Sequence, residues 1–517
     1  MTKVLFTSLP WLGKVFSAKE GHRWSYTSDK TPIISFEAFP FYLAYAAANV
    51  RKFGHEVSVI YDHKYNDTKL YPKYLKEIER IKPDVLVAET STPSYINDKK
   101  VIRDIKQVAP NTKICLTGQH ATALPEEVMQ ENFGVINHVL VGEYEFTSLE
   151  VANSKREDGS ELPHVLRNLK LHDIDSIPWP ARDLFDMNIF NDTFCENYPN
   201  AHIIFSRGCY YSCSYCNIHL SNDAVRKQRV RNIHDVIEEM KFCVEKYHPK
   251  EFWIEDDIFN GSEEKVREFC RVKIQESVDT PFSALCHAKI QRETLEMMKM
   301  AGCTGIKFGV ESADHEVLLR LKKGLTMDMV KKTLINCKEL GIRTHLTFAI
   351  GLPGDTEETI KKTLRFAQSA GTAYQVSIAT PFPGTPLYEE AKANGWLNFN
   401  SWEDFDGLNK ALINYPTLSA EILYKYYLLA QDSTYKKVFT SGDYKKYLKM
   451  IYQERGVVGL LKLAKRPDII KSVWNSITGT KKHLKLSEEA EKAIDLNTFV
   501  DKPHQPKQEV KPITIQT

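Results

Sequence analysis

The sequence has no apolar run of about 18 residues, so we expect no transmembrane helix. It also has no excess of one charge, because 69 lysines and arginines stand against 67 aspartates and glutamates, a net charge of +2. Such a balance gives no electrostatic reason to expect a nucleic-acid partner. The first residues, MTKVLFTSLPWLG, contain an apolar run too short for a secretory signal and lack its cleavage site.

The remaining composition is that of a globular protein, with 42% hydrophobic and 26% charged residues. A length of 517 residues suggests about two to four domains. The ten cysteines are not expected to form disulfides in so large a chain.

Three of the ten cysteines lie close together in the sequence. Cys209, Cys213 and Cys216 occur in SRGCYYSCSYC with the spacing C-x3-C-x2-C and no fourth cysteine nearby. A closed zinc or iron–sulfur site takes four protein ligands. Three thiolates on a short loop can instead hold a four-iron cluster and leave one iron free to bind a small molecule. A zinc site completed by a distant ligand is the weaker alternative, because the other seven cysteines occur singly.

This triplet resembles the cluster motif of the radical S-adenosylmethionine (SAM) enzymes. The resemblance implies a [4Fe-4S] cluster on the three cysteines, with SAM chelated by the free iron and cleaved to a 5′-deoxyadenosyl radical. Tyr215 is at the position that packs near adenine in that family, and plain loop packing is the alternative. An oxygen-sensitive cluster also implies a reducing, cytoplasmic location.

The first 150 residues alternate short apolar runs with helical patterns. The runs are 4–8, 56–61, 85–90, 113–117 and 138–141, and the helical patterns are 41–53, 71–82, 97–108 and 125–131. This alternation predicts an α/β fold, a Rossmann-like parallel sheet with helices on both faces. Ligands on such sheets bind at the carboxyl ends of the strands.

Small and polar residues follow four of these runs: Leu9, Pro10, Thr90, Ser91, Thr92, Gly118, Gln119, His120, Gly142 and Glu143. Ordinary turn chemistry explains any one of them. Together they resemble the cobalamin-binding (B12) domain of a radical SAM subfamily, and TGQHATALPEEV is similar to that subfamily's T-G-G-x-H-A-T-x-x-P-E-E pattern. The resemblance implies that these residues bind cobalamin.

The signature D-x-H-x-x-G, by which other B12 enzymes supply an axial histidine, is missing. The resemblance therefore implies that His120 lies beside the nucleotide tail of cobalamin and not on cobalt.

Strand–helix alternation resumes after residue 200. The strand-like runs are 203–206, 251–255, 282–286, 305–310, 344–350 and 375–379, and the helical patterns include 236–247, 263–276, 293–301, 327–340 and 358–370. Six such units predict a partial triosephosphate-isomerase-type barrel. Chemistry in these barrels collects at the C-terminal ends of the strands, and the cysteine loop directly follows the first run.

Other strand ends of this barrel carry motifs of the same subfamily. IEDDIF places Glu255, Asp256 and Asp257 where the family receives the amino group of SAM, with a solvated turn as the alternative. GVES places Glu311 and Ser312 at the barrel mouth, and FAIGLPGD places Gly351 where the backbone can approach adenine. ATPFPGTPLYEEAKANGW is also typical of the subfamily.

The sequence predicts five segments. These are a cobalamin-binding domain at 1–152, a linker at 153–200, a radical SAM barrel at 201–390, a helical C-terminal region at 391–500 and a disordered tail at 501–517. We expect the helical region to cap the barrel. An amphipathic stretch at 457–476 leaves open a peripheral membrane contact, although a solvated helix face is more common.

By resemblance, the chain is expected to be a methyltransferase that uses methylcobalamin and the 5′-deoxyadenosyl radical on an unactivated carbon. The substrate would be a small molecule or a lipid, and the reductant a flavodoxin or ferredoxin. A B12-dependent cyclase or rearrangement enzyme without methyl transfer is the first alternative, and a non-catalytic cobalamin or metal sensor is the second. Methylthiolation of tRNA is disfavoured because the extra cysteines of that family are not apparent.

Overall fold

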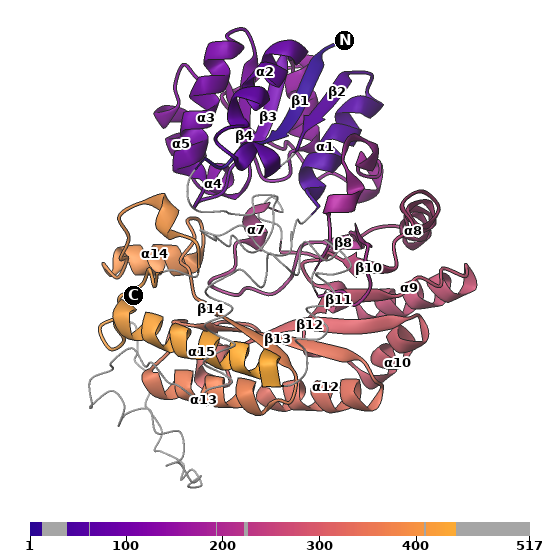
Figure 1. Ribbon diagram of the computed structural model, residues 1–517, viewed down its shortest axis with the longest axis vertical. Helices are drawn as coiled ribbons and strands as arrows, with labels where there is room; N and C mark the ends of the chain where they lie inside the picture. Colours follow the sequence, from indigo (N-terminus) through magenta and orange to yellow (C-terminus); the bar gives the residue numbers. More distant parts are fainter. Residues whose placement is uncertain (13–38, 62, 193, 222–225, 408–409, 441–517) are drawn as a thin grey trace, which may run out of the picture. The chain divides into compact units, whose positions relative to one another are not determined.

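The computed structural model describes residues 1–12, 39–61, 63–192, 194–221, 226–407 and 410–440 (Figure 1). All of them belong to one unit, Met1–Lys462. The predictions for residues 441–517, including the amphipathic stretch at 457–476 and the tail, lie outside the described residues.

The N-terminal part of the chain forms a parallel six-stranded sheet in the order β2-β1-β3-β4-β5-β6. Its strands are β1 (Lys3–Ser8), β2 (Glu56–Ile60), β3 (Val85–Glu89), β4 (Lys113–Thr117), β5 (His138–Val141) and β6 (Val165–Arg167). Successive residues of β1 enter different cores: Val4 and Phe6 face one helix layer and Leu5 faces the other. Burial on both faces explains why these strands read as continuous apolar runs.

Helices cover both faces of this sheet, as the sequence predicted. α1 (Phe41–Lys52) and α6 (Glu145–Asn153) lie on one face, while α2 (Tyr71–Ile81), α3 (Tyr95–Val108) and α5 (Pro125–Glu131) lie on the other. The short α4 (Gln119–Ala123) follows β4.

The strand β6 lies inside the segment that the sequence analysis assigned to a linker. It pairs with β5, with Val139 opposite Val165, and buries Leu166 completely. Three residues are too few to show a strand period, so the sequence pattern did not reveal this strand.

A second parallel sheet has the order β14-β13-β12-β11-β10-β7. Its strands are β7 (Asn200–Ile203), β10 (Glu251–Ile254), β11 (Phe282–Cys286), β12 (Cys303–Glu311), β13 (Arg343–Ile350) and β14 (Ala373–Ile378). The edge strands β7 and β14 do not pair with each other, so the sheet is a partial barrel. The helices α8 (Ile233–Tyr247), α9 (Glu263–Gln275), α10 (Arg292–Met300), α12 (Met327–Glu339) and α13 (Glu357–Ser369) connect its strands (Figure 1).

The first barrel strand ends earlier than predicted. The expected run, 203–206, overlaps β7 only at Ile203, and Ser206 and Arg207 form the separate strand β8, which pairs antiparallel with β9 (Arg229–Val230). Hydrogen bonds from Phe205 and Ser206 to Asp256 turn the chain away from the barrel direction.

The residues after the barrel include α14 (Pro386–Ala393), the short helix η6 (Trp402–Asp404) and α15 (Ala420–Thr440). α15 contacts β14 and contributes Leu423, Tyr426 and Tyr427 to the barrel core. Trp402 instead packs against the core of the N-terminal sheet.

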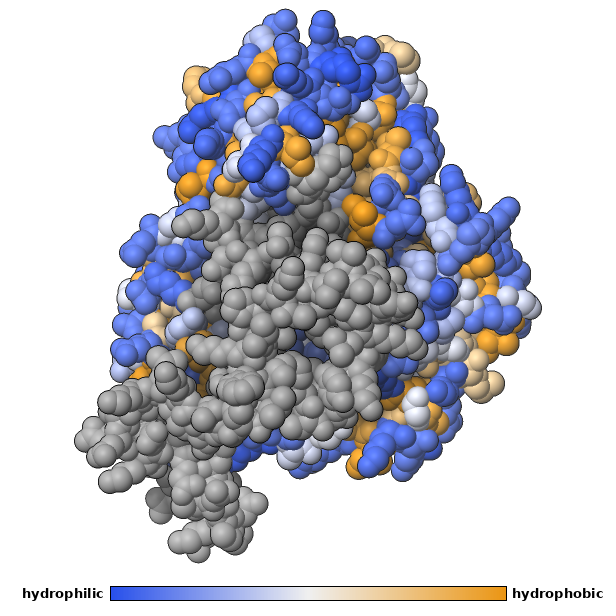
Figure 2. Space-filling model, viewed as in Figure 1, coloured by the Kyte–Doolittle hydropathy of each residue, from blue (hydrophilic) through white to orange (hydrophobic). Residues whose placement is uncertain are grey.

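Within the described ranges, no helix is both long and apolar enough to cross a membrane. Figure 2 shows hydrophobic residues interspersed with hydrophilic ones on the described part of one face.

Candidate functional site

The three clustered cysteines lie together on the loop that follows β8. Gly208 has a φ of +88°, which turns the chain into this loop. The Cys216 amide donates a hydrogen bond of 3.1 Å to the Cys213 carbonyl. None of the three forms a disulfide, and all three line a cavity of 370 Å³.

The chemistry of these thiols suits a bound metal group. Burial raises the pKa of the Cys216 thiol to about 12, so its ionisation needs a bound cation. No three ligating side chains converge on one point as they do around a single ion, at least among the described residues.

The cavity lies at the carboxyl ends of the barrel strands. Of the residues predicted to bind SAM, Tyr215, Asp257 and Glu311 line it together with the cysteines. The other four, Glu255, Asp256, Ser312 and Gly351, are not part of its lining.

The two aspartates after β10 hold the segment that leads to the cysteine loop. Asp256 is fully buried and accepts hydrogen bonds from the Phe205 amide, at 2.8 Å, and from the Ser206 hydroxyl. Desolvation raises its pKa to about 7. Asp257 accepts a 2.7 Å hydrogen bond from the Gly208 amide. Both oxygens of Asp256 accept hydrogen bonds from the protein, and Asp256 does not line the cavity, whereas Asp257 does.

Glu311 forms a buried ion pair at the end of β12. Its carboxylate accepts a 2.9 Å hydrogen bond from Lys323 and also bonds to the Tyr215 hydroxyl. The backbone of Glu311 has a φ of +66°, a strained conformation for a residue with a side chain. Sequence reasoning assigned no role to Lys323, which lies twelve residues after Glu311.

Ser312 and Gly351 form hydrogen bonds with nearby residues of the chain. The Ser312 hydroxyl lies 3.2 Å from that of Thr363 and accepts a hydrogen bond from the Asp314 amide. The Gly351 amide donates to Asp355 at 2.9 Å. Their roles in SAM binding stay predictions.

The predicted cobalamin residues lie at the carboxyl edge of the first sheet, as parallel strands require. Thr90 donates to Asp98 at 2.8 Å, and the hydroxyl groups of Ser91 and Ser94 lie 3.0 Å apart. After β1, which lies between β2 and β3, Leu9 and Pro10 are buried.

His120 is completely buried between two aromatic rings. Its ring centroid lies 4.2 Å from that of Tyr95 and 5.1 Å from that of Trp402. Burial lowers the pKa of His120 to about 3, so the ring is neutral. Nδ1 lies 3.3 Å from the Thr92 hydroxyl, while Nε2 is buried and makes no hydrogen bond within the described part of the chain.

Glu143, after β5, contacts the barrel segment. It accepts hydrogen bonds from Arg229 and lies 3.6 Å from Arg207, which forms a 2.6 Å ion pair with Glu145. The Arg207 guanidinium also lies 4.9 Å from the ring centroids of Tyr42 and Tyr45. Long-range pairs of this kind leave no local sequence signal, and sequence reasoning missed them.

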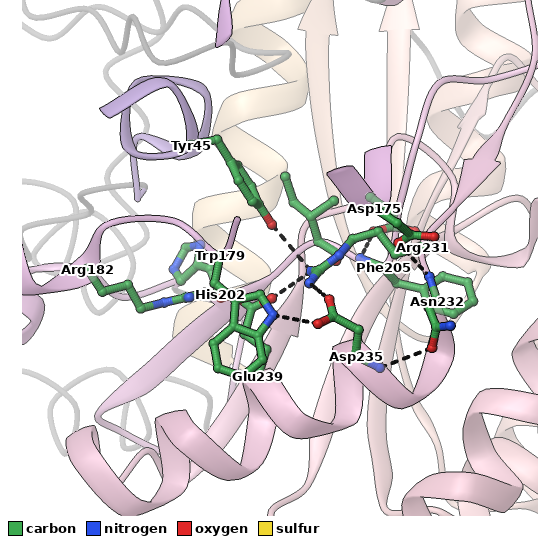
Figure 3. Close-up of polar contacts among 12 residues, drawn as sticks. Tyr45, Asp175, Trp179, Arg182, His202, Phe205, Arg231, Asn232, Asp235 and Glu239 are labelled. Atoms are coloured by element: carbon green, nitrogen blue, oxygen red, sulfur yellow. Dashed lines mark hydrogen bonds and ion pairs between the residues drawn. The ribbon is translucent and has the colours of Figure 1, made fainter. Parts of the chain in front are cut away.

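A second buried network joins α1 and the linker to α8 (Figure 3). Glu239 lies between Arg182, at 2.5 Å, and Arg231, at 2.6 Å. Burial alone would raise the pKa of Glu239, but the two guanidinium groups hold it below its usual range. Arg231 also donates to the Tyr45 hydroxyl at 3.3 Å.

Comparison with family models assigns both halves of the chain. A model of the B12 binding domain matches residues 34–152, and a model of the radical SAM superfamily matches residues 203–367.

Curated relatives include methyltransferases and a cyclase. The chain is 29% identical to "Uncharacterized methyltransferase PH0819" of Pyrococcus horikoshii, over 72% of this chain and 83% of the relative. It is 25% identical to the anaerobic magnesium-protoporphyrin IX monomethyl ester cyclase of Cereibacter sphaeroides, over 68% of this chain and 60% of the relative.

Two solved structures resemble the fold over most of the chain. TsrM, a radical SAM methyltransferase from Kitasatospora setae with cobalamin and a [4Fe-4S] cluster bound, matches with a TM-score of 0.58 and 16% identity, over 77% of this chain and 79% of TsrM. The cobalamin-dependent radical enzyme OxsB, with aqua-cobalamin and SAM bound, matches with a TM-score of 0.62 and 13% identity, over 93% of this chain and 76% of OxsB. At these identities the likeness concerns the fold.

Proposed function

We propose that this chain, which joins a B12-binding domain to a radical SAM domain, is a cobalamin-dependent radical SAM methyltransferase. Its substrate would be a small molecule or a lipid with an unactivated carbon as the methyl acceptor. The observation that carries this proposal is the cavity of 370 Å³, where the three cysteines lie beside charged groups suited to SAM.

The residues fit the cofactors of this chemistry. Cys209, Cys213 and Cys216 would hold the [4Fe-4S] cluster, while Tyr215 and Asp257 at the same cavity would contact SAM. When bound, the cluster and SAM supply a carbon-centred radical and cobalamin supplies the methyl group.

The strand ends of the first sheet would hold cobalamin. The residues proposed to do so are Leu9, Pro10, Thr90, Ser91, Thr92, Gly118, Gln119, His120, Gly142 and Glu143. The buried Nε2 of His120, which lacks a hydrogen bond within the described residues, supports a polar contact to the nucleotide tail.

The protein's own groups orient the reactants and exclude water. The Glu311–Lys323 pair would receive the charged amino-acid part of SAM, because it offers one group of each sign beside Cys213. Asp257 fixes the start of the cysteine loop through the Gly208 amide. A flavodoxin or ferredoxin would deliver the electron.

Anaerobic turnover with methyl-labelled SAM tests this function. We expect the reconstituted protein to form 5′-deoxyadenosine, S-adenosylhomocysteine and a labelled product. Cys213→Ala should lose the cluster absorbance and all three products. Cys337→Ala is the matched control, since this cysteine is buried in α12 away from the cavity.

The same experiment separates the alternatives. Formation of 5′-deoxyadenosine without S-adenosylhomocysteine would contradict methyl transfer and favour cyclisation or rearrangement. One curated relative is named a cyclase. A wild-type protein with no cluster absorbance and no SAM cleavage would favour a cobalamin or metal sensor.

A further inference from the structure

The cavity reaches below the cysteines into the barrel. Strand residues two apart point to the same side, so Lys307, Gly309 and Glu311 of β12 all face it. Thr347 of β13, which pairs with Gly309, and Gln375 of β14, which pairs with Thr347, also line the cavity. This end of the cavity therefore offers an ammonium, an amide and a hydroxyl group.

The ammonium group of Lys307 makes no hydrogen bond or ion pair with any residue in the described part of the chain, although its charge acts on Asp192 and the residue lines this half-enclosed space. The titratable groups that face it are Asp192 and His345. Burial raises the pKa of Asp192 while the charge of Lys307 lowers it, and one Asp192 oxygen accepts a hydrogen bond from the Phe194 amide at 2.6 Å. Burial lowers the pKa of His345 to about 3, so this ring is neutral.

A different lysine, Lys323, lies near the cysteines. Lys323 interacts electrostatically with Cys213 and is neutralised by Glu311 at 2.9 Å. Lys307 precedes Glu311 by four residues in β12, and the Glu311–Lys323 pair lies over Gly309, where a Cβ would collide with the Glu311 carboxylate and lie 3.0 Å from the Lys323 ammonium. Lys307 is therefore a second lysine of the cavity, and it is not the one that pairs with Glu311.

We propose that Lys307, with Gln375 and Thr347, binds an anionic group of the substrate, either a carboxylate or a phosphate. This inference rests on the proposed function, because it assumes that a substrate other than SAM enters the cavity. An anion paired with the ammonium group would make a charge-assisted hydrogen bond in a partly desolvated site. The adjacent amide and hydroxyl can donate to its remaining oxygens.

The test uses holoenzyme reconstituted with cluster, SAM and cobalamin. A library of metabolites is screened by thermal shift in matched pairs, each carboxylate or phosphate monoester beside its neutral amide or methyl ester. The variants are Lys307→Gln, which removes the charge, and Lys307→Arg, which keeps it. Lys331→Gln on the exposed face of α12 is the control. Cluster absorbance and cobalamin content confirm that each variant is loaded and folded.

We expect stabilising compounds to be the anionic members of their pairs. Their apparent Kd should rise about tenfold or more in Lys307→Gln, and much less in Lys307→Arg and Lys331→Gln. Three outcomes would each overturn the proposal. The stabilising compounds could be the neutral members of their pairs, their binding could be unaffected by Lys307→Gln, or the library could contain no stabilising anion.

Product analysis on the hits keeps the two proposals apart. An anion that needs Lys307 to bind but yields no S-adenosylhomocysteine and no methylated product would contradict methyl transfer and leave the anion site standing. A neutral compound that is methylated would contradict the anion site and leave methyl transfer standing.

Discussion

At the scale of single residues, Asp355 is a carboxylate held in a site with little water. It accepts hydrogen bonds from the Gly351 amide at 2.9 Å, the Leu352 amide at 3.0 Å and the Thr359 hydroxyl at 2.6 Å. These bonds favour the ionised form, but desolvation outweighs them and raises the pKa of Asp355 from 3.8 to about 6. The folded protein therefore binds a proton here over a pH range in which the unfolded chain does not.

We predict that Asp355→Asn becomes progressively more stable relative to the wild type as the pH rises from about 4 to 6. The pKa of Asp355 is higher in the folded protein than in the unfolded chain, so protonation of Asp355 stabilises the wild type fully at pH values below the unfolded pKa. This stabilisation is lost as the pH rises through the folded pKa. The relative change should be about 1–3 kcal/mol and level off above pH 6.5 or so. Urea unfolding at several pH values measures it.

Asp314→Asn provides the contrast for that measurement. Although burial opposes it, the hydrogen bond from Lys362 holds the pKa of Asp314 below its usual range. Its difference from the wild type should therefore stay constant between pH 4.5 and 7 or so. A constant difference for Asp355→Asn as well would contradict the prediction.

At the scale of elements, the turn from β4 into α4 depends on Gly118. This residue has a φ of +94° and a ψ of −175°, a region that only glycine occupies readily. A Cβ at this position would lie 2.5 Å from the Thr90 carbonyl oxygen at the end of β3. Two neighbouring strand ends can approach each other only because position 118 has no side chain.

We predict that Gly118→Ala lowers the free energy of unfolding by about 2–4 kcal/mol, because backbone strain and a clash with backbone act together. Gly134→Ala is the matched control: φ is +79° there, but a Cβ would meet nothing within 4 Å. That change should cost about 1 kcal/mol. Equal costs in urea unfolding would mean that the close approach to Thr90 is unimportant.

The elements also show how far sequence patterns reach. Most strands and helices were predicted to within three residues, because continuous apolar runs and helical periods mark elements buried in a layered fold. β6 has only three residues, and the end of β7 is decided by the distant Asp256. The triplet of cysteines was visible as a motif, whereas Lys323 and Lys307 needed the fold to bring them to the cavity. The individual contacts to SAM and cobalamin stay predictions.

At the scale of the whole molecule, Arg207 links the two halves of the chain beside the cysteine loop. It is 2% exposed and pairs with Glu145 of α6 while lying two residues before Cys209. An unpaired Glu145 would be costly, because burial already raises the pKa of its carboxyl. The pair therefore fixes the loop against the strand ends proposed to hold cobalamin.

We predict that Arg207→Lys uncouples SAM cleavage from methyl transfer. Lysine keeps the charge but loses the planar group that meets Glu145 and both tyrosine rings. The ratio of 5′-deoxyadenosine to S-adenosylhomocysteine should rise about tenfold, since small displacements of reacting groups are costly. Arg51→Lys, in the half-exposed pair with Asp183, should leave the ratio unchanged. An unchanged ratio in Arg207→Lys would refute this role.

The contact between His120 and Trp402 has a consequence for synthesis of the chain. The two residues are 282 positions apart, so a ribosome working at about 5–20 residues per second needs roughly 14–56 s to pass from one to the other. β5 and β6 are made early in this interval, and from then until Trp402 is made the first sheet lacks the ring that covers His120. The nascent protein thus keeps one side of its first domain open until translation has passed the barrel, which gives a large cofactor time to enter.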